Sequence, residues 1–237
     1  MISDESRITN HESRLPLWRR IAIALGVIGA TVAVHEAAHA VAAVRGGGKV
    51  KEVGVGFGPR VARLRVRGLP VVLRAFPLGG YAAVDVDSLP PLSRIRMLLV
   101  GPLANIAVGV PLLMAFRRHP AVVLGDGRNV GLTGFVGTMS ALSQAAAAGP
   151  GAVGRLAGAI NVGLGLMNLL PLYPLDGGHV VMSLMEARGV PRQARMAFAR
   201  LTAAIFFLLV QSAMLGDLRR LTAKARTGQQ ANMRTGE

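Results

Sequence analysis

One apolar run that carries three ionisable side chains constrains this chain more than any other feature. Residues 21–44 are almost entirely apolar but contain His35-Glu36-Ala37-Ala38-His39. As a helix, about 24 residues extend roughly 36 Å, enough to cross a hydrocarbon core of about 30 Å. Ionisable groups within such a span are costly and indicate a functional site. We therefore expect a transmembrane helix that carries chemistry.

The spacing of the two histidines favours a metal. His35 and His39 lie four residues apart, so on a helix their rings share one face and can bind one ion. Glu36 is turned about 100° away, which suits a general base beside the metal better than a third ligand. The alternative is a chance HExxH, a pattern that also recurs in soluble helices.

The overall composition supports a membrane protein and limits the metal ligands. The hydrophobic fraction is 51% and the mean hydropathy is +0.46. Without cysteine, a metal must use imidazole and carboxylate, a ligand set that suits zinc. The net charge of +15 comes with only 4% aromatic residues, so a base-stacking nucleic-acid surface is not expected. Arginines that flank membrane segments and face anionic headgroups of the lipid bilayer explain the charge better.

Four long apolar segments predict an α-helical polytopic membrane protein with about four transmembrane helices. The segments are 21–44, 97–116, 152–172 with a continuation to 185, and 197–215. The first exceeds the apolar region of a signal peptide, about 7–15 residues, and is interpreted as a retained span. Lysines and arginines are nearly balanced between the two faces, so charge alone does not orient the chain.

Residues 50–84 alternate apolar and polar side chains between Gly and Pro turn signals. Three runs, 49–57, 61–67 and 71–76, predict a small antiparallel sheet directly after the first span. One interpretation is a plain connecting hairpin. The other is a guide for substrate, because an exposed strand edge pairs with extended peptide.

A second acidic residue marks the other half of the predicted site. Of the twelve acidic residues, only Glu36 and Asp176 lie deep in apolar surroundings. Pro171 and Pro174 break the third apolar segment just before Asp176. Irregular backbone at membrane depth must be buried in protein or line a cavity. Two histidines and Asp176 leave a fourth tetrahedral position open, as in catalytic zinc sites; a lone aspartate capping a broken helix is the alternative.

Two further polar residues have open interpretations. His179 lies three residues after Asp176 and can hydrogen-bond it, bind the metal directly, or simply begin the next helical turn. Asn105 lies in the second apolar segment, where an asparagine often joins helices by hydrogen bonds. A role in the site is an equally good interpretation of Asn105 from its position alone.

The domain organisation follows from these segments. We expect a polar N-terminal flank over 1–20, one membrane-embedded domain over 21–218, and a basic polar tail over 219–237 that is a frayed helix or disordered. Between the second and third spans, residues 117–151 leave no room for an ordinary extra domain of about 50 residues or more.

Five motifs carry a resemblance that covers the chain from about residue 34 to 218. They are His-Glu-Ala-Ala-His at 35–39, Gly-Phe-Gly-Pro at 56–59, Pro-Leu-Gly-Gly-Tyr at 77–81, Gly-Pro-Leu-Ala-Asn at 101–105, and the stretch from Asn168 to Gly178 that ends in Leu-Asp-Gly-Gly. In this order the chain resembles the site-2 protease family of intramembrane zinc metalloproteases, in particular the bacterial members that cleave membrane-anchored anti-sigma factors.

The resemblance implies a site and a setting. One Zn²⁺ would be bound by His35, His39 and Asp176, with Glu36 as catalytic base. Asn105 and Asn168 would assist substrate or transition-state binding.

The resemblance also implies that the 50–84 sheet is the membrane-associated element near the cleft. The expected location is the bacterial cytoplasmic membrane, with the active site near the cytosolic face and a transmembrane protein such as an anti-sigma factor as substrate. Many relatives carry PDZ domains between the second and third spans, and residues 117–151 are too short for one.

The sequence thus predicts regulated intramembrane proteolysis, with Glu36 activating a water molecule at the zinc. A membrane metal-ion transporter is a rival, since histidines and acidic residues on broken helices also build transport sites. Four spans, the lack of an inverted second half and the placement of Glu36 disfavour it. A catalytically silent homologue that binds membrane partners is the second rival, disfavoured because every catalytic position is filled.

Overall fold

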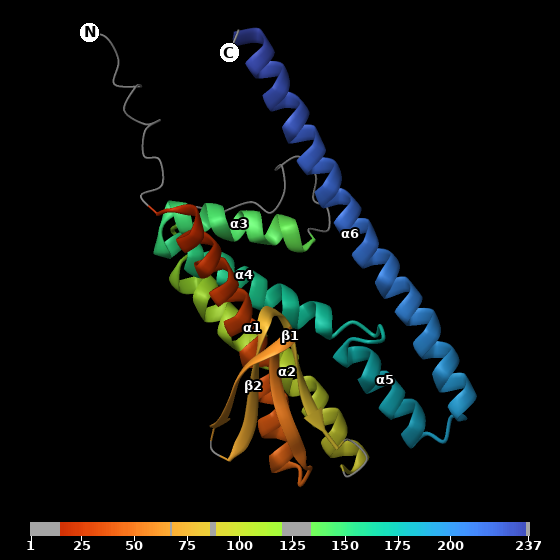
Figure 1. Cartoon of the computed structure of the whole chain (residues 1–237). Helices are drawn as coiled ribbons and strands as arrows, with labels where there is room; N and C mark the ends of the chain where they lie inside the picture. Colours follow the sequence, from red (N-terminus) through yellow and green to blue (C-terminus); the bar gives the residue numbers. More distant parts are fainter. Residues whose placement is uncertain (1–14, 67, 86–88, 120–133, 236–237) are drawn as a thin grey trace.

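The computed structural model describes residues 15–66, 68–85, 89–119 and 134–235, which form a helical protein with one small sheet (Figure 1). The elements in chain order are α1 (Leu17–Arg45), β1 (Val50–Val66), β2 (Leu69–Val84), α2 (Pro91–Ala115), α3 (Phe135–Ala148), α4 (Pro150–Asn168), α5 (Asp176–Ala187) and α6 (Arg192–Thr235). Within this described part, three helices are long and apolar enough to cross a membrane: α1, α2 and α6 as far as Ala223. These are the predicted first, second and fourth spans.

The predicted third span is divided into two helices. α4 ends at Asn168 and α5 begins at Asp176, with Pro171 and Pro174 in the connection. The predicted break and its carboxylate are therefore present. α4 is not among the helices that meet the length and hydropathy of a membrane span, so a crossing at this position stays a prediction.

The helices α1, α2, α3 and α4 pack together, and small residues allow the closest contact. Ala24 of α1, Leu142 of α3 and Leu156 of α4 belong to one buried apolar cluster. Where α2 meets α4, a Cβ added to Gly109 would lie 2.7 Å from the carbonyl oxygen of Gly158. Backbones this close are typical of helices that associate through small residues in membranes. Polar side chains on α2 and α4 can therefore reach one another.

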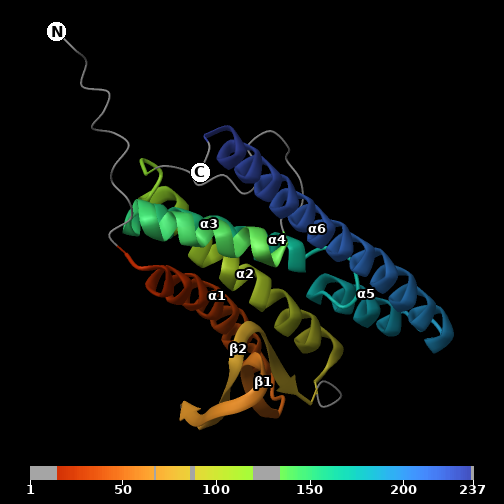
Figure 2. The same ribbon diagram turned by 45° about the horizontal axis from the view of Figure 1, so that its top comes forward.

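The sheet and α6 lie on opposite sides of this helix group (Figure 2). The sheet packs against α1, whereas α6 contacts α5 and α3. Asp217 of α6 is buried and accepts the backbone N–H of Gly137 at 2.9 Å, at the start of α3. A carboxylate in this position satisfies free amide groups of a helix N-terminus.

Two helical segments differ from the sequence expectation. Helix α3 lies in the 117–151 stretch, for which no helix was predicted; residues 120–133 of that stretch fall outside the described residues. The basic tail over 219–237, predicted to be a frayed helix or disorder, continues α6 as helix through Thr235. Residues 1–14 of the predicted N-terminal flank also fall outside the described part.

The predicted antiparallel sheet is present but is built from two long strands and not three short ones. β1 and β2 pair throughout their length with several register shifts. Because both strands bend, residues 53–55 have Cα partners in 71–73 and also in 80–82. Among the described residues, 80–84 pairs on one side only, with 50–55. This one-sided segment lies against α1, where a Cβ added to Gly80 would be 2.7 Å from Val32 Cγ1.

Candidate metal centre and active site

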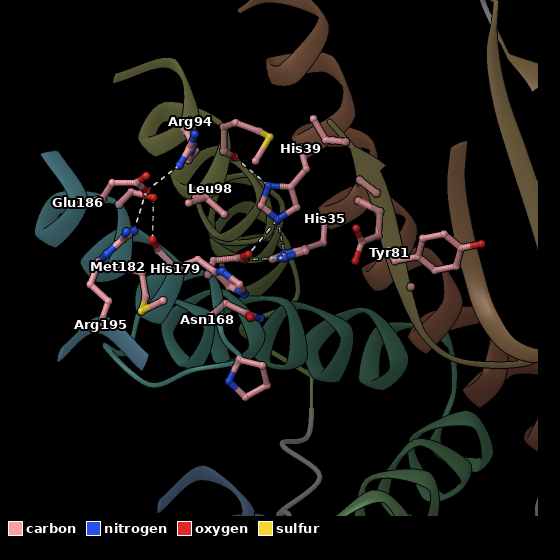
Figure 3. Close-up of a pocket in the computed structure, with 18 residues that line it drawn as sticks. His35, His39, Tyr81, Arg94, Leu98, Asn168, His179, Met182, Glu186 and Arg195 are labelled. Carbon is pink, nitrogen blue, oxygen red and sulfur yellow. Dashed lines mark hydrogen bonds and ion pairs between the residues drawn. The ribbon is translucent and has the colours of Figure 1, made fainter. Parts of the chain in front are cut away.

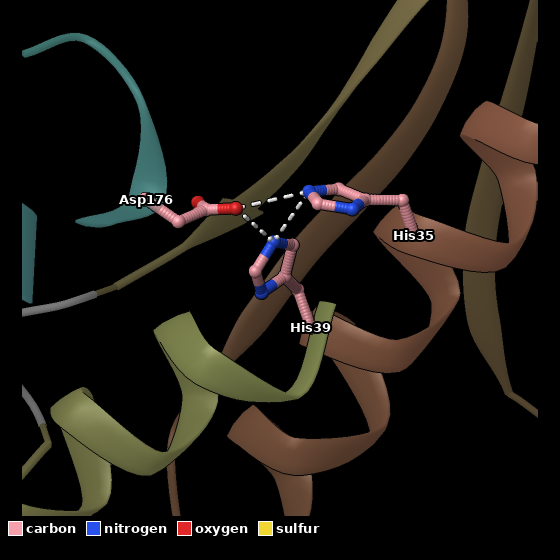
Figure 4. Close-up of side chains that lie close together, drawn as sticks. All are labelled: His35, His39 and Asp176. Atoms are coloured by element: carbon pink, nitrogen blue, oxygen red, sulfur yellow. Dashed lines mark hydrogen bonds and ion pairs between the residues drawn. The ribbon is translucent and has the colours of Figure 1, made fainter. Parts of the chain in front are cut away.

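The three predicted ligands meet at one point (Figure 4). The Nε2 atoms of His35 and His39 are 3.0 Å apart, and Asp176 Oδ2 lies 3.0 Å from the first and 3.3 Å from the second. Ligands bound at about 2.0–2.1 Å to a tetrahedral zinc lie about 3.3 Å from each other. The three atoms therefore fit a zinc ion in both chemistry and spacing.

Local sequence explains how these atoms converge. His35 and His39 are one turn apart on α1, and their rings meet edge to face with centroids 4.6 Å apart. Asp176 is the first residue of α5, a position where the helix dipole favours negative charge. The proline-containing connection ends the preceding helix and sets the start of α5 opposite α1. The HExxH helix and the broken segment thus each contribute one side of the centre.

Hydrogen bonds on the far side of each ring define the protonation of both histidines. His39 Nδ1 lies 2.8 Å from the Met97 carbonyl oxygen, which can only accept. His35 Nδ1 lies 2.6 Å from Asn105 Oδ1. Each Nδ1 therefore carries the proton and donates it, which leaves both Nε2 lone pairs facing Asp176. Metal-binding histidines are held in this way in general.

Close backbone approach is needed at two positions of the site. A Cβ on Gly101 of α2 would lie 2.3 Å from His39 Nε2, so any side chain there would collide with the ring. A Cβ on Gly80 of β2 would lie 2.8 Å from Glu36 Cγ. Two motif glycines therefore let α2 and the sheet come within contact distance of α1.

A cavity of about 560 Å³ contains the ligands and connects them to the sheet (Figure 3). Glu36 lines it beside Gly80, Tyr81 and Ala82 of β2. The side chain of Glu36 is half-buried, and Ala82 lies beside its carboxylate. The predicted base therefore lines the same cavity as the three candidate ligands and lies against Gly80 of the one-sided segment of β2.

The other predicted site residues are distributed differently. Asn168 lines the cavity and donates one amide N–H to the Leu164 carbonyl at 3.0 Å, so its second N–H is not used in that bond. His179 also lines the cavity and packs against the ring of Tyr173 at 4.8 Å, but it is not in the ligand group. Asn105 is fully buried and does not line the cavity.

Several residues near the site were missed by the sequence reasoning. Thr31 and Asn161 are buried and hydrogen-bonded to each other, and Asn161 also binds Asn105. A polar residue inside an apolar segment was the signal that could have identified both. Three charged residues, Arg94 of α2, Glu186 of α5 and Arg195 of α6, line the cavity as an ion-paired group. Nothing local in the sequence indicates that they meet.

Fold and site together describe a largely helical protein with three apolar helices of membrane-spanning length and a His-His-Asp group that could hold a metal ion. The model of peptidase family M50 matches residues 22–210. The chain belongs to peptidase family M50, which confirms the resemblance to site-2 proteases.

Three similar proteins illustrate the relationship. A Brucella suis protein named as a zinc metalloprotease is 32% identical over 157 residues, 61% of this chain and 40% of the relative. The chloroplastic membrane metalloprotease ARASP of Arabidopsis thaliana is 30% identical over 120 residues, 39% and 27% of the two chains. A Vibrio cholerae protein, also named as a zinc metalloprotease, is 40% identical over 65 residues, 26% and 14%. The chain thus spans less than half the length of the curated relatives it matches.

Proposed function

We propose that this protein is an intramembrane zinc metalloendopeptidase, which hydrolyses a peptide bond in or near a transmembrane segment of a substrate protein. One observation carries the proposal: His35, His39 and Asp176 present three ligand atoms within 4.8 Å of one another, and Glu36 lines the same cavity. The ligand-bearing helix is itself long and apolar enough to span a membrane.

The chain's own residues can perform the required proton transfers. When bound, zinc polarises the scissile carbonyl and makes a water molecule acidic enough to lose a proton near neutral pH. Glu36 accepts that proton and passes it to the leaving amine. The second amide N–H of Asn168 is a donor for the tetrahedral oxyanion. His179 lines the same cavity three residues after Asp176, and its proposed part in this chemistry is indirect, through Asp176.

The sheet is the proposed contact for the scissile segment. A peptide must be extended to be cleaved, and an extended peptide can add to the one-sided segment 80–84. Gly80, Tyr81 and Ala82 line the cavity beside Glu36, so a peptide added there would lie along the base.

The setting and selectivity follow from the same proposal. The protein acts in the bacterial cytoplasmic membrane with the cavity near the cytosolic face, and a membrane-anchored anti-sigma factor is a substrate of the expected kind. Selection occurs without a PDZ domain between α2 and α4, through substrate size and helix instability near the cut.

The decisive experiment combines metal analysis and cleavage on the purified full chain. We expect about one zinc per chain and cleavage of a model transmembrane substrate, with cleavage lost in Glu36→Gln. Zinc uptake into sealed vesicles without cleavage would identify the transporter alternative. Zinc binding with neither cleavage nor transport would identify a catalytically silent homologue.

A further inference from the structure

A buried polar network surrounds the far side of His35 and is distinct from the cavity. Its members are Thr31 of α1, Asn105 of α2 and Asn161 of α4, with exposed fractions of 4%, 0% and 4%. Three buried polar side chains from three helices are expensive unless all their groups are paired. The network therefore needs a physical reason beyond packing.

The hydrogen bonds of Asn105 have only one consistent direction. Its Nδ2 donates to the Thr31 carbonyl at 3.1 Å and to Asn161 Oδ1 at 2.9 Å. Its Oδ1 is then the acceptor that faces His35 Nδ1 at 2.6 Å. Both amide protons and the carbonyl oxygen are used, so the side chain has no donor left for a substrate or an oxyanion.

The next bonds continue in the same direction and end on α1. Asn161 Nδ2 donates to Thr31 Oγ1 and to the Ala157 carbonyl, both at 2.9 Å. Asn161 Oδ1 must therefore be the acceptor for Asn105. Thr31 lies one turn before His35, so the network is hydrogen-bonded to α1 at two residues, Thr31 and His35. The amide of Asn105 is thus held in the single orientation that presents an oxygen to His35.

The two metal-binding histidines differ in this respect. His39 Nδ1 bonds to a backbone carbonyl of Met97, which cannot rotate away. His35 relies on a side-chain amide, which could flip and offer N–H in place of oxygen unless its neighbours prevent it. The close contact between α2 and α4 at Gly109 and Gly158 brings Asn161 of α4 within hydrogen-bond distance of Asn105.

We propose that Asn105, Asn161 and Thr31 are positioning residues that fix the tautomer and ring angle of His35 for the metal. This inference rests on the zinc site of the proposed function, and it replaces the predicted transition-state role of Asn105. Partners of this kind typically change metal affinity about 10–100-fold when removed. The effect should decrease with distance from His35 along the network.

Zinc affinity, measured by chelator competition on the purified full chain without substrate, tests the proposal. We expect Asn105→Leu to weaken zinc binding about 10–100-fold, Asn161→Leu to weaken it less, and Thr31→Val to weaken it least. Thr138→Val is the matched control, because Thr138 of α3 bonds within its own helix to Gly134 at 3.0 Å. It should bind zinc like the unmodified chain.

A double variant and a spectroscopic signal separate positioning from general destabilisation. Asn105→Leu combined with Thr31→Val should bind zinc no more weakly than Asn105→Leu alone, because both act through one path. In chains with ¹⁵N-labelled histidine, Thr31→Val should shift the His35 Nδ1–H resonance and leave that of His39 unchanged. This measurement also decides the question if Asn105→Leu does not fold, since Thr31→Val adds no volume.

Equal zinc affinity in the unmodified chain and Asn105→Leu would overturn the proposal. An unshifted His35 resonance in Thr31→Val, or an equal loss of affinity in Thr138→Val, would also do so. If the unmodified chain itself binds no zinc, the proposed function fails. That result can be distinguished from the three results above, because each of them requires that the unmodified chain binds zinc.

Discussion

The two sides of the metal centre are held in different ways. On α1, each histidine has a second hydrogen bond behind its ring, His35 to Asn105 and His39 to Met97. On α5, the described polar contacts of the Asp176 carboxylate are with the Nε2 atoms of those same two rings. The histidines are therefore oriented by the helix packing, whereas Asp176 is oriented by where its backbone begins.

This difference separates two ligands that are in position before an ion binds from one whose position depends on where α5 begins. Ligands held by packing need no reorganisation when the ion binds, which favours affinity. Asp176 is placed by an interrupted backbone, and α5 packs against both α2 and α6. We therefore expect changes on the α1 side to affect metal binding most, and changes toward α6 to affect it least.

The largest effect is expected from removing a ligand on the preorganised side. His39→Ala leaves one imidazole and should weaken zinc binding by more than the roughly 10–100-fold of outer-shell changes, with no detectable turnover. Asp176→Asn keeps both oriented imidazoles and a neutral oxygen, so its loss should be smaller. Chelator competition on the two variants measures the difference. A greater loss in Asp176→Asn would reverse the comparison.

Glu36→Gln should separate chemistry from metal binding on the same helix. Glutamine keeps the size of the side chain but cannot accept the proton, and base catalysis is typically worth about 10²–10⁴-fold. Zinc content should stay near one ion per chain while turnover falls by that factor. Cleavage at close to the original rate would show that another group is the base.

The parts predicted correctly from sequence are those with a local signal. Two histidines four residues apart specify one helix face, two prolines before Asp176 specify a break, and strict alternation specifies strands. The Asn105–Asn161–Thr31 network has no local signal, because it depends on how three helices pack. From its position alone, Asn105 was equally well interpreted as a residue that joins helices and as a residue of the site. Its hydrogen bonds connect helices and also reach His35. Helix α3 was missed because its Ala-rich segment lacks a clear amphipathic pattern.

A smaller effect is expected where α2 touches the metal centre. Gly101→Ala adds a methyl group that would lie 2.3 Å from His39 Nε2, so the ring or the helix must shift. Zinc affinity should fall about tenfold, within the range for altered ligand support. Gly163→Ala on α4 is the control, because nothing lies within 4 Å of its added Cβ. Equal affinities in both variants would mean that α2 adjusts freely.

The sheet should affect turnover without affecting zinc. Ala82→Pro places a ring in the cavity lining beside Glu36 and removes a backbone donor from the strand edge proposed to hold the substrate, so turnover should fall about tenfold. Ala75→Pro, at an exposed position of β2 that does not line the cavity, is the matched control. An equal loss of turnover in both variants would mean that the sheet only connects α1 to α2 and does not contact the substrate.

The smallest effect is expected at the charged group farthest along α5 from Asp176. Glu186 Oε2 bridges Arg94 of α2 at 3.0 Å and Arg195 of α6 at 3.1 Å, but its side chain is 48% exposed. Exposed ion pairs contribute only about 0–1 kcal/mol. Glu186→Gln should therefore lower the free energy of unfolding by no more than about 1 kcal/mol and leave zinc affinity unchanged.

Thermal unfolding and chelator competition on Glu186→Gln measure both quantities, with Arg96→Gln as a charge-removal control on an exposed position of α2. Because Glu186 joins α2 to α6 across α5, its loss removes one of the links between α6 and the wall of the cavity. If the histidine side alone sets metal affinity, losing this link changes nothing at the ion. A clear fall in zinc affinity in Glu186→Gln but not in Arg96→Gln would show that α6 helps to hold Asp176, and the two sides of the centre would then not be independent.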